Sequence, residues 1–120
     1  MKSILTIALL AALSVAPGYA QKSGPYKMTE EGVKPPVLVK EVKPQYTDDA
    51  KTRRVQGNVE VEAVVKTDGT VGDVTVTKSL DPQLDEEAVK ATKQWRFRPG
   101  TKDGNAVDVL VHIELTFTLK

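Results

Sequence analysis

The chain has 120 residues, with 17 Lys and Arg against 16 Asp and Glu, one His and no Cys, and this length allows one compact domain. The balanced charge gives no electrostatic reason to expect nucleic acid or an anionic membrane as the main partner. Without Cys, the chain cannot form a thiolate nucleophile, a disulfide framework or a thiolate metal site.

The chain begins with a segment typical of an export signal. Lys2 precedes an uncharged, mostly apolar run from Ile4 to Ala16, which ends at Pro17-Gly18. The run is shorter than the ~20 residues needed to span a bilayer, and Gly18-x-Ala20 fits a cleavage site. We therefore predict that residues 1–20 are a signal peptide removed after Ala20. The alternative is an uncleaved inner-membrane anchor, the one case in which we expect membrane contact.

Two segments of different character follow the predicted signal peptide. Residues 21–36 contain three Pro, two Gly, mixed charges and no apolar period, which is typical of a flexible linker. The folded domain is predicted to cover residues 37–120. Its first residues, from Val37 to Val42, fit either a short edge strand or a clamp against the core.

A short helix is predicted around Ala50. Thr47 is a suitable cap, Asp48-Asp49 favours the first turn, and Arg53-Arg54 favours the last turn. Apolar residues are few in this segment, so we expect neighbouring elements to hold the helix in place.

The next predicted element is a hairpin. Apolar and polar residues alternate from Val59 to Val65, Asp68-Gly69 supplies a turn, and alternation resumes from Val74 to Thr77. Val71 is out of step with the second run. We therefore predict a bulge at Gly72-Asp73.

The longest predicted helix begins after Asp81-Pro82, and its apolar residues recur at helical spacing as far as Trp95. The longest predicted strand runs from Val109 to Leu119, with apolar residues at every second position. A right-handed crossover through the helix places this third strand beside the first, in the spatial order 2-1-3. The third strand is therefore expected at an edge of the sheet.

The order of these residues resembles the C-terminal domain of TonB, the energy-transducing protein of Gram-negative bacteria. The resemblance runs from about Pro44 to Leu119 and includes the run Trp95-Arg96-Phe97-Arg98-Pro99 at a helix end. The other residues that carry it are Tyr46, Ala50, Arg54-Val55-Gln56-Gly57, the valines of the first long strand, Asp68-Gly69, Val71, Val74, Val76, Ser79, Asp85, Ala88, Ala91, Gly104 and Phe117. It implies an α+β fold in which two helices lie on one face of a three-stranded antiparallel sheet.

The resemblance also implies a function and a location. Domains of this family bind a short extended segment, the TonB box, of outer-membrane transporters in the periplasm, and their third strand accepts the bound segment. This agrees with the edge position deduced above. We therefore predict a periplasmic interaction module, linked to TonB-dependent transport, that binds an extended peptide by strand addition. The predicted contact residues of the third strand are Leu110, His112, Glu114 and Thr116.

The first helix supplies two further candidate contacts, Lys51 and Arg54. Lys51 stands where well-known members of the family carry a Gln that contacts the box. Together with Arg53, these residues form a basic cluster that fits either a carboxylate of the partner or charge pairing at the end of the helix.

The same edge has other predicted occupants. A second copy of the chain would pair with it in a homodimer, and the segment from Val37 to Val42 would cover it within one chain. If residues 1–20 are retained, the chain is instead predicted to be a short membrane-anchored energy transducer.

Two residues invite interpretations as chemical sites. His112 shares a strand face with Glu114, but zinc sites seldom form with one His and no Cys, so we expect complementary solvated charges there. Trp95 continues the apolar stripe of the long helix and is predicted to be core rather than a stacking platform. No Ser lies in a setting typical of a nucleophile, and we predict no enzymatic activity, no metal and no cofactor.

Overall fold

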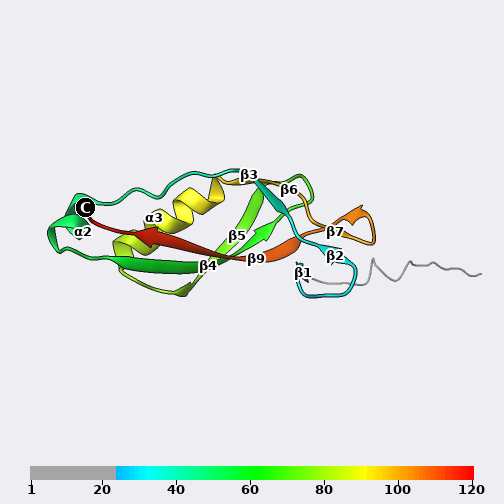
Figure 1. Cartoon of the computed structure of the whole chain (residues 1–120), viewed down its shortest axis with the longest axis horizontal. Coiled ribbons are helices and arrows are strands. Elements are labelled where there is room, and N and C mark those ends of the chain that lie inside the picture. Colours follow the sequence, from blue (N-terminus) through cyan, green and yellow to red (C-terminus); the bar gives the residue numbers. More distant parts are fainter. Residues whose placement is uncertain (1–23) are drawn as a thin grey trace, which may run out of the picture.

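The fold centres on an antiparallel sheet in the computed structural model, which describes residues 24–120. Strands β4 (Gly57–Val65) and β5 (Val71–Lys78) form the predicted hairpin, and β9 (Val109–Phe117) pairs with the other side of β4. The order β5-β4-β9 confirms the order 2-1-3 predicted for the three long strands. Figure 1 shows the longer helix lying over one face of this sheet.

The register between β4 and β9 decides which side chains enter the core. The two strands pair without a shift, from Gly57 opposite Phe117 to Val65 opposite Val109. Because side chains alternate between the two faces of a sheet, the odd-numbered residues of both strands share one face. The buried residues on that face are Val59, Val61, Ala63, Val65, Val109, Val111, Leu115 and Phe117.

The predicted bulge lies in β5. Ala63 pairs with Val74 and Val65 pairs with Val71. Two residues of β5, Gly72 and Asp73, therefore stand opposite a single residue of β4, which is a bulge of one extra residue. The preceding turn needs Gly69, whose φ is +87° and whose Cβ would lie 2.1 Å from the Phe97 carbonyl oxygen. The Gly69 carbonyl accepts a hydrogen bond from the Phe97 N–H at 2.9 Å, which joins the hairpin turn to the chain after the long helix.

The long helix, α3 (Pro82–Lys93), packs against β4 and β5. The Asp81 carboxylate accepts hydrogen bonds from the N–H groups of Gln83 and Leu84, at 3.0 and 3.3 Å, and so caps the first turn. The apolar stripe predicted for this helix is buried, and Trp95, 8% exposed, continues it beyond the last turn.

The short helix, α2 (Asp48–Thr52), is capped by Thr47, whose hydroxyl accepts a hydrogen bond from the Ala50 N–H. Arg53 then joins the two helices. Its guanidinium lies 2.8 Å from the Asp49 carboxylate and 2.9 Å from the Asp81 carboxylate, the cap of α3. Ala50 is buried in the same cluster as the core residues of α3, so the α+β fold with two helices is confirmed.

The N-terminal part of the described chain differs from the flexible linker expected for residues 21–36. Strand β1 (Tyr26–Lys27) pairs in parallel with the start of β9, and β2 (Val33–Lys34) pairs with β7 (Thr101–Lys102). Strand β7 in turn forms a small hairpin with β8 (Asn105–Ala106). Strands of two residues are too short to produce an alternating pattern, so the sequence contains no signal for them.

The next strand, β3 (Val37–Lys40), pairs with β6 (Arg96–Arg98) in a separate two-stranded ribbon. The alternative that the segment from Val37 to Val42 covers β9 is therefore wrong. The Trp95 indole N–H donates to the Val42 carbonyl at 2.8 Å, which holds this segment beside the end of α3. Within residues 24–120, no helix is long and apolar enough to cross a bilayer, and the predicted signal peptide lies outside the described residues.

The ion pair between the helices makes stability depend on pH. The hydrogen bond from Arg53 is the main cause that holds the pKa of Asp81 below its ordinary value, so this charge stabilises the fold above about pH 4. That contribution is lost as the pH falls through the folded-state pKa. Asp81→Asn keeps a cap acceptor but removes the charge, so we expect a lower Tm at neutral pH and a difference from wild type that shrinks on acidification. Circular dichroism melts across the pH range test this, and a difference that is independent of pH would contradict it.

Candidate functional site

The candidate site is the side of β9 that faces away from β4. Among residues 24–120, the strand that pairs with this side is β1, and its contacts are limited to Val109 and Leu110. From Val111 to Phe117, this edge has no strand partner in the described part of the chain. An exposed strand edge of this length is able to accept an added strand.

The hydrogen bond from β1 shows which backbone groups point outward. The Tyr26 N–H donates to the Asp108 carbonyl at 2.9 Å, so this carbonyl faces the outer side of β9. Backbone groups on one side of a strand come from every second residue. The even-numbered residues therefore direct their N–H and C=O groups outward, and in the predicted site these are Leu110, His112, Glu114 and Thr116.

The four predicted β9 residues do not have equal access. Leu110 already pairs with Lys27 of β1, so the N-terminal end of the predicted binding segment is occupied. His112, Glu114 and Thr116 lie beyond β1, and their side chains are exposed on the wet face of the sheet. Three of the four predicted β9 residues, from His112 onward, thus lie on the accessible edge.

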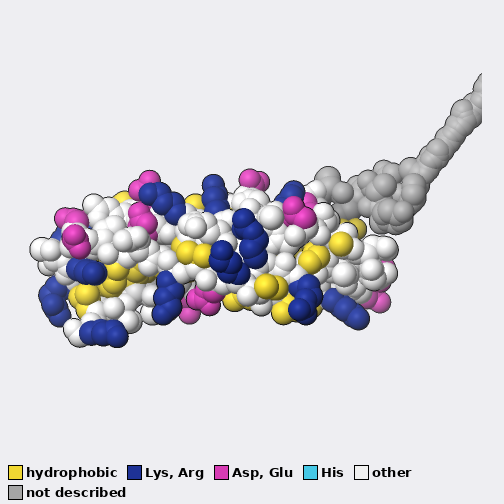
Figure 2. Space-filling model, turned by 90° about the horizontal axis from the view of Figure 1, so that it is seen from above, with side chains coloured by type: hydrophobic (Ala, Val, Ile, Leu, Met, Phe, Trp, Pro, Cys, Tyr) yellow, Lys and Arg dark blue, Asp and Glu magenta, His cyan; other side chains and the backbone are white. Residues whose placement is uncertain are grey.

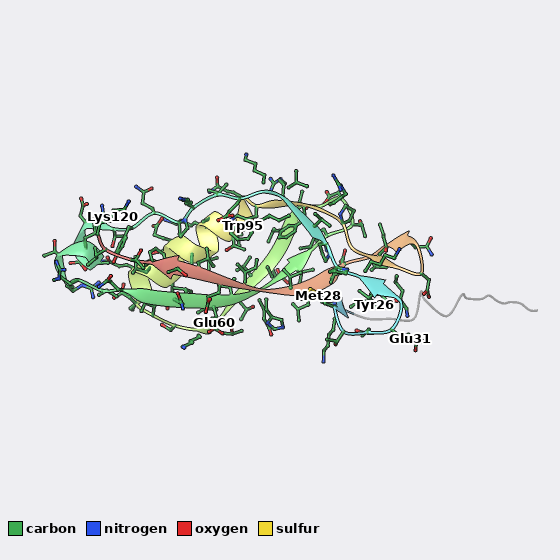
Figure 3. All side chains as sticks on the ribbon, viewed as in Figure 1. Tyr26, Met28, Glu31, Glu60, Trp95 and Lys120 are labelled. Carbon is green, nitrogen blue, oxygen red and sulfur yellow. The ribbon has the colours of Figure 1, made fainter. Side chains whose placement is uncertain are left out.

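A groove of about 360 Å³ runs along this accessible edge. Its first wall is the β9 edge from Glu114 to Phe117 with Thr118 directly after it, and its second wall is the chain that connects β3 to α2. The residues of the second wall are Glu41, Lys43, Pro44 and Tyr46, and Trp95 also lines the groove. Figure 3 shows Trp95 at the end of α3, next to this connecting chain.

Two aromatic residues hold the second wall in place. The Trp95 N–H binds the Val42 carbonyl, as described above, and the Tyr46 hydroxyl donates to the Val55 carbonyl. The Tyr46 ring packs edge-on against Phe117 of β9, with 5.4 Å between ring centroids and 78° between ring planes. The groove therefore combines an open backbone edge with aromatic side chains.

The predicted contacts from the first helix lie at different places. The Lys51 ammonium lies 5.9 Å from the centroid of the Tyr46 ring, so this cation stands at the Phe117 end of the groove. Arg54 has a positive φ of 59° and its N–H donates to the Lys51 carbonyl, which ends the helix. Arg53 forms ion pairs with Asp49 and Asp81 of the same chain, as expected if this cation serves charge pairing at the helix end.

His112 lies on the opposite, wet face of the sheet from the core. Its Nδ1 is 3.5 Å from a carboxylate oxygen of Glu62, its cross-strand neighbour, and Glu114 accepts a hydrogen bond from Asn58. Within the described residues, no three His, Asp or Glu side chains come close enough to hold a metal ion. The contacts of His112 are those of cross-strand polar pairs.

Sequence reasoning missed the second wall of the groove. The segment from Glu41 to Tyr46 has no strand or helix period, and the helical spacing of Trp95 predicts a core residue without indicating a groove. The sequence does contain a signal in two aromatic motifs, Pro44-x-Tyr46 and the run that begins at Trp95, because a buried Tyr hydroxyl and a buried Trp N–H each need a hydrogen-bond partner.

The comparisons with known proteins agree with this geometry. The family model of the Gram-negative bacterial TonB protein C-terminal matches residues 42–119. The chain belongs to this family. The resemblance noted from the sequence is therefore confirmed, and the matched residues include the β9 wall of the groove and all of the second wall except Glu41.

Individual relatives match over part of their length. The chain is 32% identical over 88 residues to Protein TonB of Vibrio cholerae and 33% identical over 76 residues to Protein TonB of Escherichia coli. These alignments cover 72% and 62% of this chain but 36% and 31% of those proteins, so the chain spans about a third of their length. The solution structure of the Pseudomonas aeruginosa TonB CTD superimposes with a TM-score of 0.57, over 82% of this chain and 97% of that one, at 24% identity, which shows the same fold.

The bond between Trp95 and Val42 should stabilise both the core and the groove. Trp95→Phe removes the indole N–H and part of a buried side chain, so we expect the free energy of unfolding to fall by about 1–3 kcal/mol. Urea denaturation followed by circular dichroism measures the loss. We also expect faster amide exchange around Tyr46 than in the wild type, and unchanged stability would contradict the role of this bond.

Proposed function

We propose that the protein is a periplasmic, non-enzymatic interaction module. It binds an extended segment of an outer-membrane transporter, the TonB box or a similar sequence, by strand addition to β9. The observation that carries this proposal is the open edge from Val111 to Phe117 with a groove beside it. Membership of the TonB C-terminal family supports it.

The groove suggests what kind of segment would bind. A strand added to β9 would place every second side chain on the face shared by Leu115 and Phe117, where Tyr46 and Trp95 line the groove. Apolar side chains suit these positions. The remaining side chains would lie on the wet face beside His112, Glu114 and Thr116 and suit polar residues. We therefore propose an extended segment in which apolar and polar residues alternate.

The affinity of such a contact would be moderate. Each added backbone hydrogen bond contributes only about 0.5–1.5 kcal/mol, and the bound segment loses conformational freedom. Lys51, at the Phe117 end of the groove, would add attraction for a carboxylate of the partner. Arg54 is part of the same proposed basic end. A moderate affinity is suited to reversible capture.

Glu114→Pro tests strand addition. Glu114 directs its N–H to the open edge, so proline there removes an outward donor without removing a bond to β4. We expect at least about a tenfold loss of affinity for a synthetic TonB-box peptide, measured by calorimetry, because the added strand loses a bond and meets the proline ring. The matched control is Glu114→Ala, which changes the same side chain, keeps the N–H and should bind like the wild type.

Two outcomes of this experiment would contradict strand addition, and a separate measurement tests the homodimer. Equal affinity of the proline variant and the wild type, with α3 intact by circular dichroism, would contradict strand addition. Equal losses in both variants would indicate that the side chain rather than the backbone binds. The alternative of a homodimer through the same open edge is separated by sedimentation at micromolar concentration, because a strict monomer excludes it.

The periplasmic location depends on cleavage after Ala20. We expect the protein recovered from the cell envelope to begin at Gln21 and to appear in the periplasmic fraction, and intact-mass measurement checks this. Full-length protein that sediments with membranes would contradict cleavage. It would favour the alternative of a short membrane-anchored energy transducer.

A further inference from the structure

The ribbon formed by β3 and β6 has an outer face that the proposed function does not use. Phe97, in the middle of β6, packs against the core, so its neighbours Arg96 and Arg98 point to the other side. Residues directly opposite each other in an antiparallel pair share a face. The opposite pairs are Val37 with Arg98, Leu38 with Phe97, and Lys40 with Arg96.

Apolar and basic residues are therefore mixed on this outer ribbon face, which consists of Val37, Val39, Lys40, Arg96 and Arg98. Val37 is 53% exposed and Val39 is 63% exposed. The pairing of β3 with β6 shifts by one residue between Leu38 and Lys40, and Val39 is the extra residue. Val39 and Lys40 therefore both stand opposite Arg96. Of the four large apolar residues that are exposed in the described part of the chain, three are consecutive in β3, and clustered exposed apolar side chains are typical of interaction surfaces.

The charges of the outer ribbon face are available to a partner. Lys40 and Arg98 take part in none of the ion pairs formed among the described residues. Arg96 donates to the carbonyls of Lys93 and Trp95, and its charge also acts on the Asp68 carboxylate, with which it forms no ion pair at short distance. Figure 2 looks onto the side of the molecule where β3 and β6 lie, and Lys and Arg side chains gather beside hydrophobic ones there.

The exposed edge of β3 is poorly suited to adding a strand. The Phe97 N–H binds Gly69, so Arg96 and Arg98 direct their backbone groups toward β3. Among the regularly paired residues of β3, this leaves Leu38 to direct its backbone N–H and C=O groups to the open edge. Pro35 and Pro36, which precede β3, have no N–H to donate. The face of the ribbon, rather than its edge, is the surface on which a partner would bind.

We propose that the outer ribbon face docks the domain onto an anionic lipid bilayer. Lys40, Arg96 and Arg98 contact anionic headgroups, and the two exposed valines enter the interface between them. The overall charge of the chain is almost balanced, so this attraction comes from the local gathering of cations on one face. Docking through β3 and β6 uses different elements from the proposed peptide site on β9.

A fluorescent probe on the ribbon tests this in the full chain, because it reports on its own position and not on a membrane contact of residues 1–20. The sequence has no Cys, so Val39→Cys labelled with an environment-sensitive fluorophore reports on one position. Thr75→Cys, exposed on the wet face of the sheet, is the matched control. With vesicles of phosphatidylcholine containing about 30% phosphatidylglycerol, we expect a blue shift at position 39 but not at position 75. The shift should be absent with phosphatidylcholine alone and should reverse at about 0.5 M salt.

Charge variants measure the basic contribution. Lys40→Gln and Arg98→Gln should each raise the lipid concentration for half-maximal shift about fivefold, which corresponds to about 1 kcal/mol per cation. Lys78→Gln, on the opposite side of the sheet beside Glu60, is the matched control and should leave that concentration unchanged. Equal effects of all three variants would overturn the proposal.

Two further outcomes would overturn it. The first is a probe at position 39 that does not respond to anionic vesicles, or responds no more than the probe at position 75. The second is a shift produced by soluble polyglutamate but not by vesicles, which would assign the outer ribbon face to an acidic protein partner instead.

Discussion

The pairing of β4 with β9 is the constraint on which the rest of the structure depends. Because the two strands pair without a register shift, the odd-numbered residues of both enter the core, and the even-numbered residues of β9 direct their backbone groups to the open edge. A slip of one residue would reverse both assignments at once. The buried valines of β4 and Leu115 and Phe117 of β9 therefore stabilise the fold and also keep the outward backbone groups in position.

The groove beside β9 exists because a segment without regular structure is held at a fixed place. The chain from Glu41 to Tyr46 is bound at one point by the Trp95 indole and at another by the packing of Tyr46 on Phe117. Both contacts use aromatic rings that have one apolar body and one polar atom, so each ring packs and forms a hydrogen bond at the same time. The result is a second wall that turns a simple strand edge into a groove lined by aromatic residues.

Charges have two different roles in this domain. Arg53 joins α2 to the cap of α3 through Asp81, and most other ion pairs lie on the surface, where each contributes little to stability. On the ribbon of β3 and β6, by contrast, Lys40, Arg96 and Arg98 stand beside exposed valines and form none of the ion pairs found among the described residues. A balanced composition therefore conceals a local concentration of positive charge, because folding decides which residues become neighbours.

The sequence by itself determined the three long strands, both helices with their caps, the bulge in β5 and the strand order. Each of these depends on a local period, a capping residue or the handedness of a crossover. It also predicted that β9 has a free edge and identified the family, whereas the binding role of the even-numbered β9 residues stays a prediction. Only the tertiary structure decided that β1 occupies the edge at Leu110, that β3 pairs with β6, and that the segment before α2 forms a groove with Trp95. Strands of two to four residues are too short for a periodic signal, and a contact such as Trp95 with Val42 joins residues 53 positions apart, which no local pattern encodes.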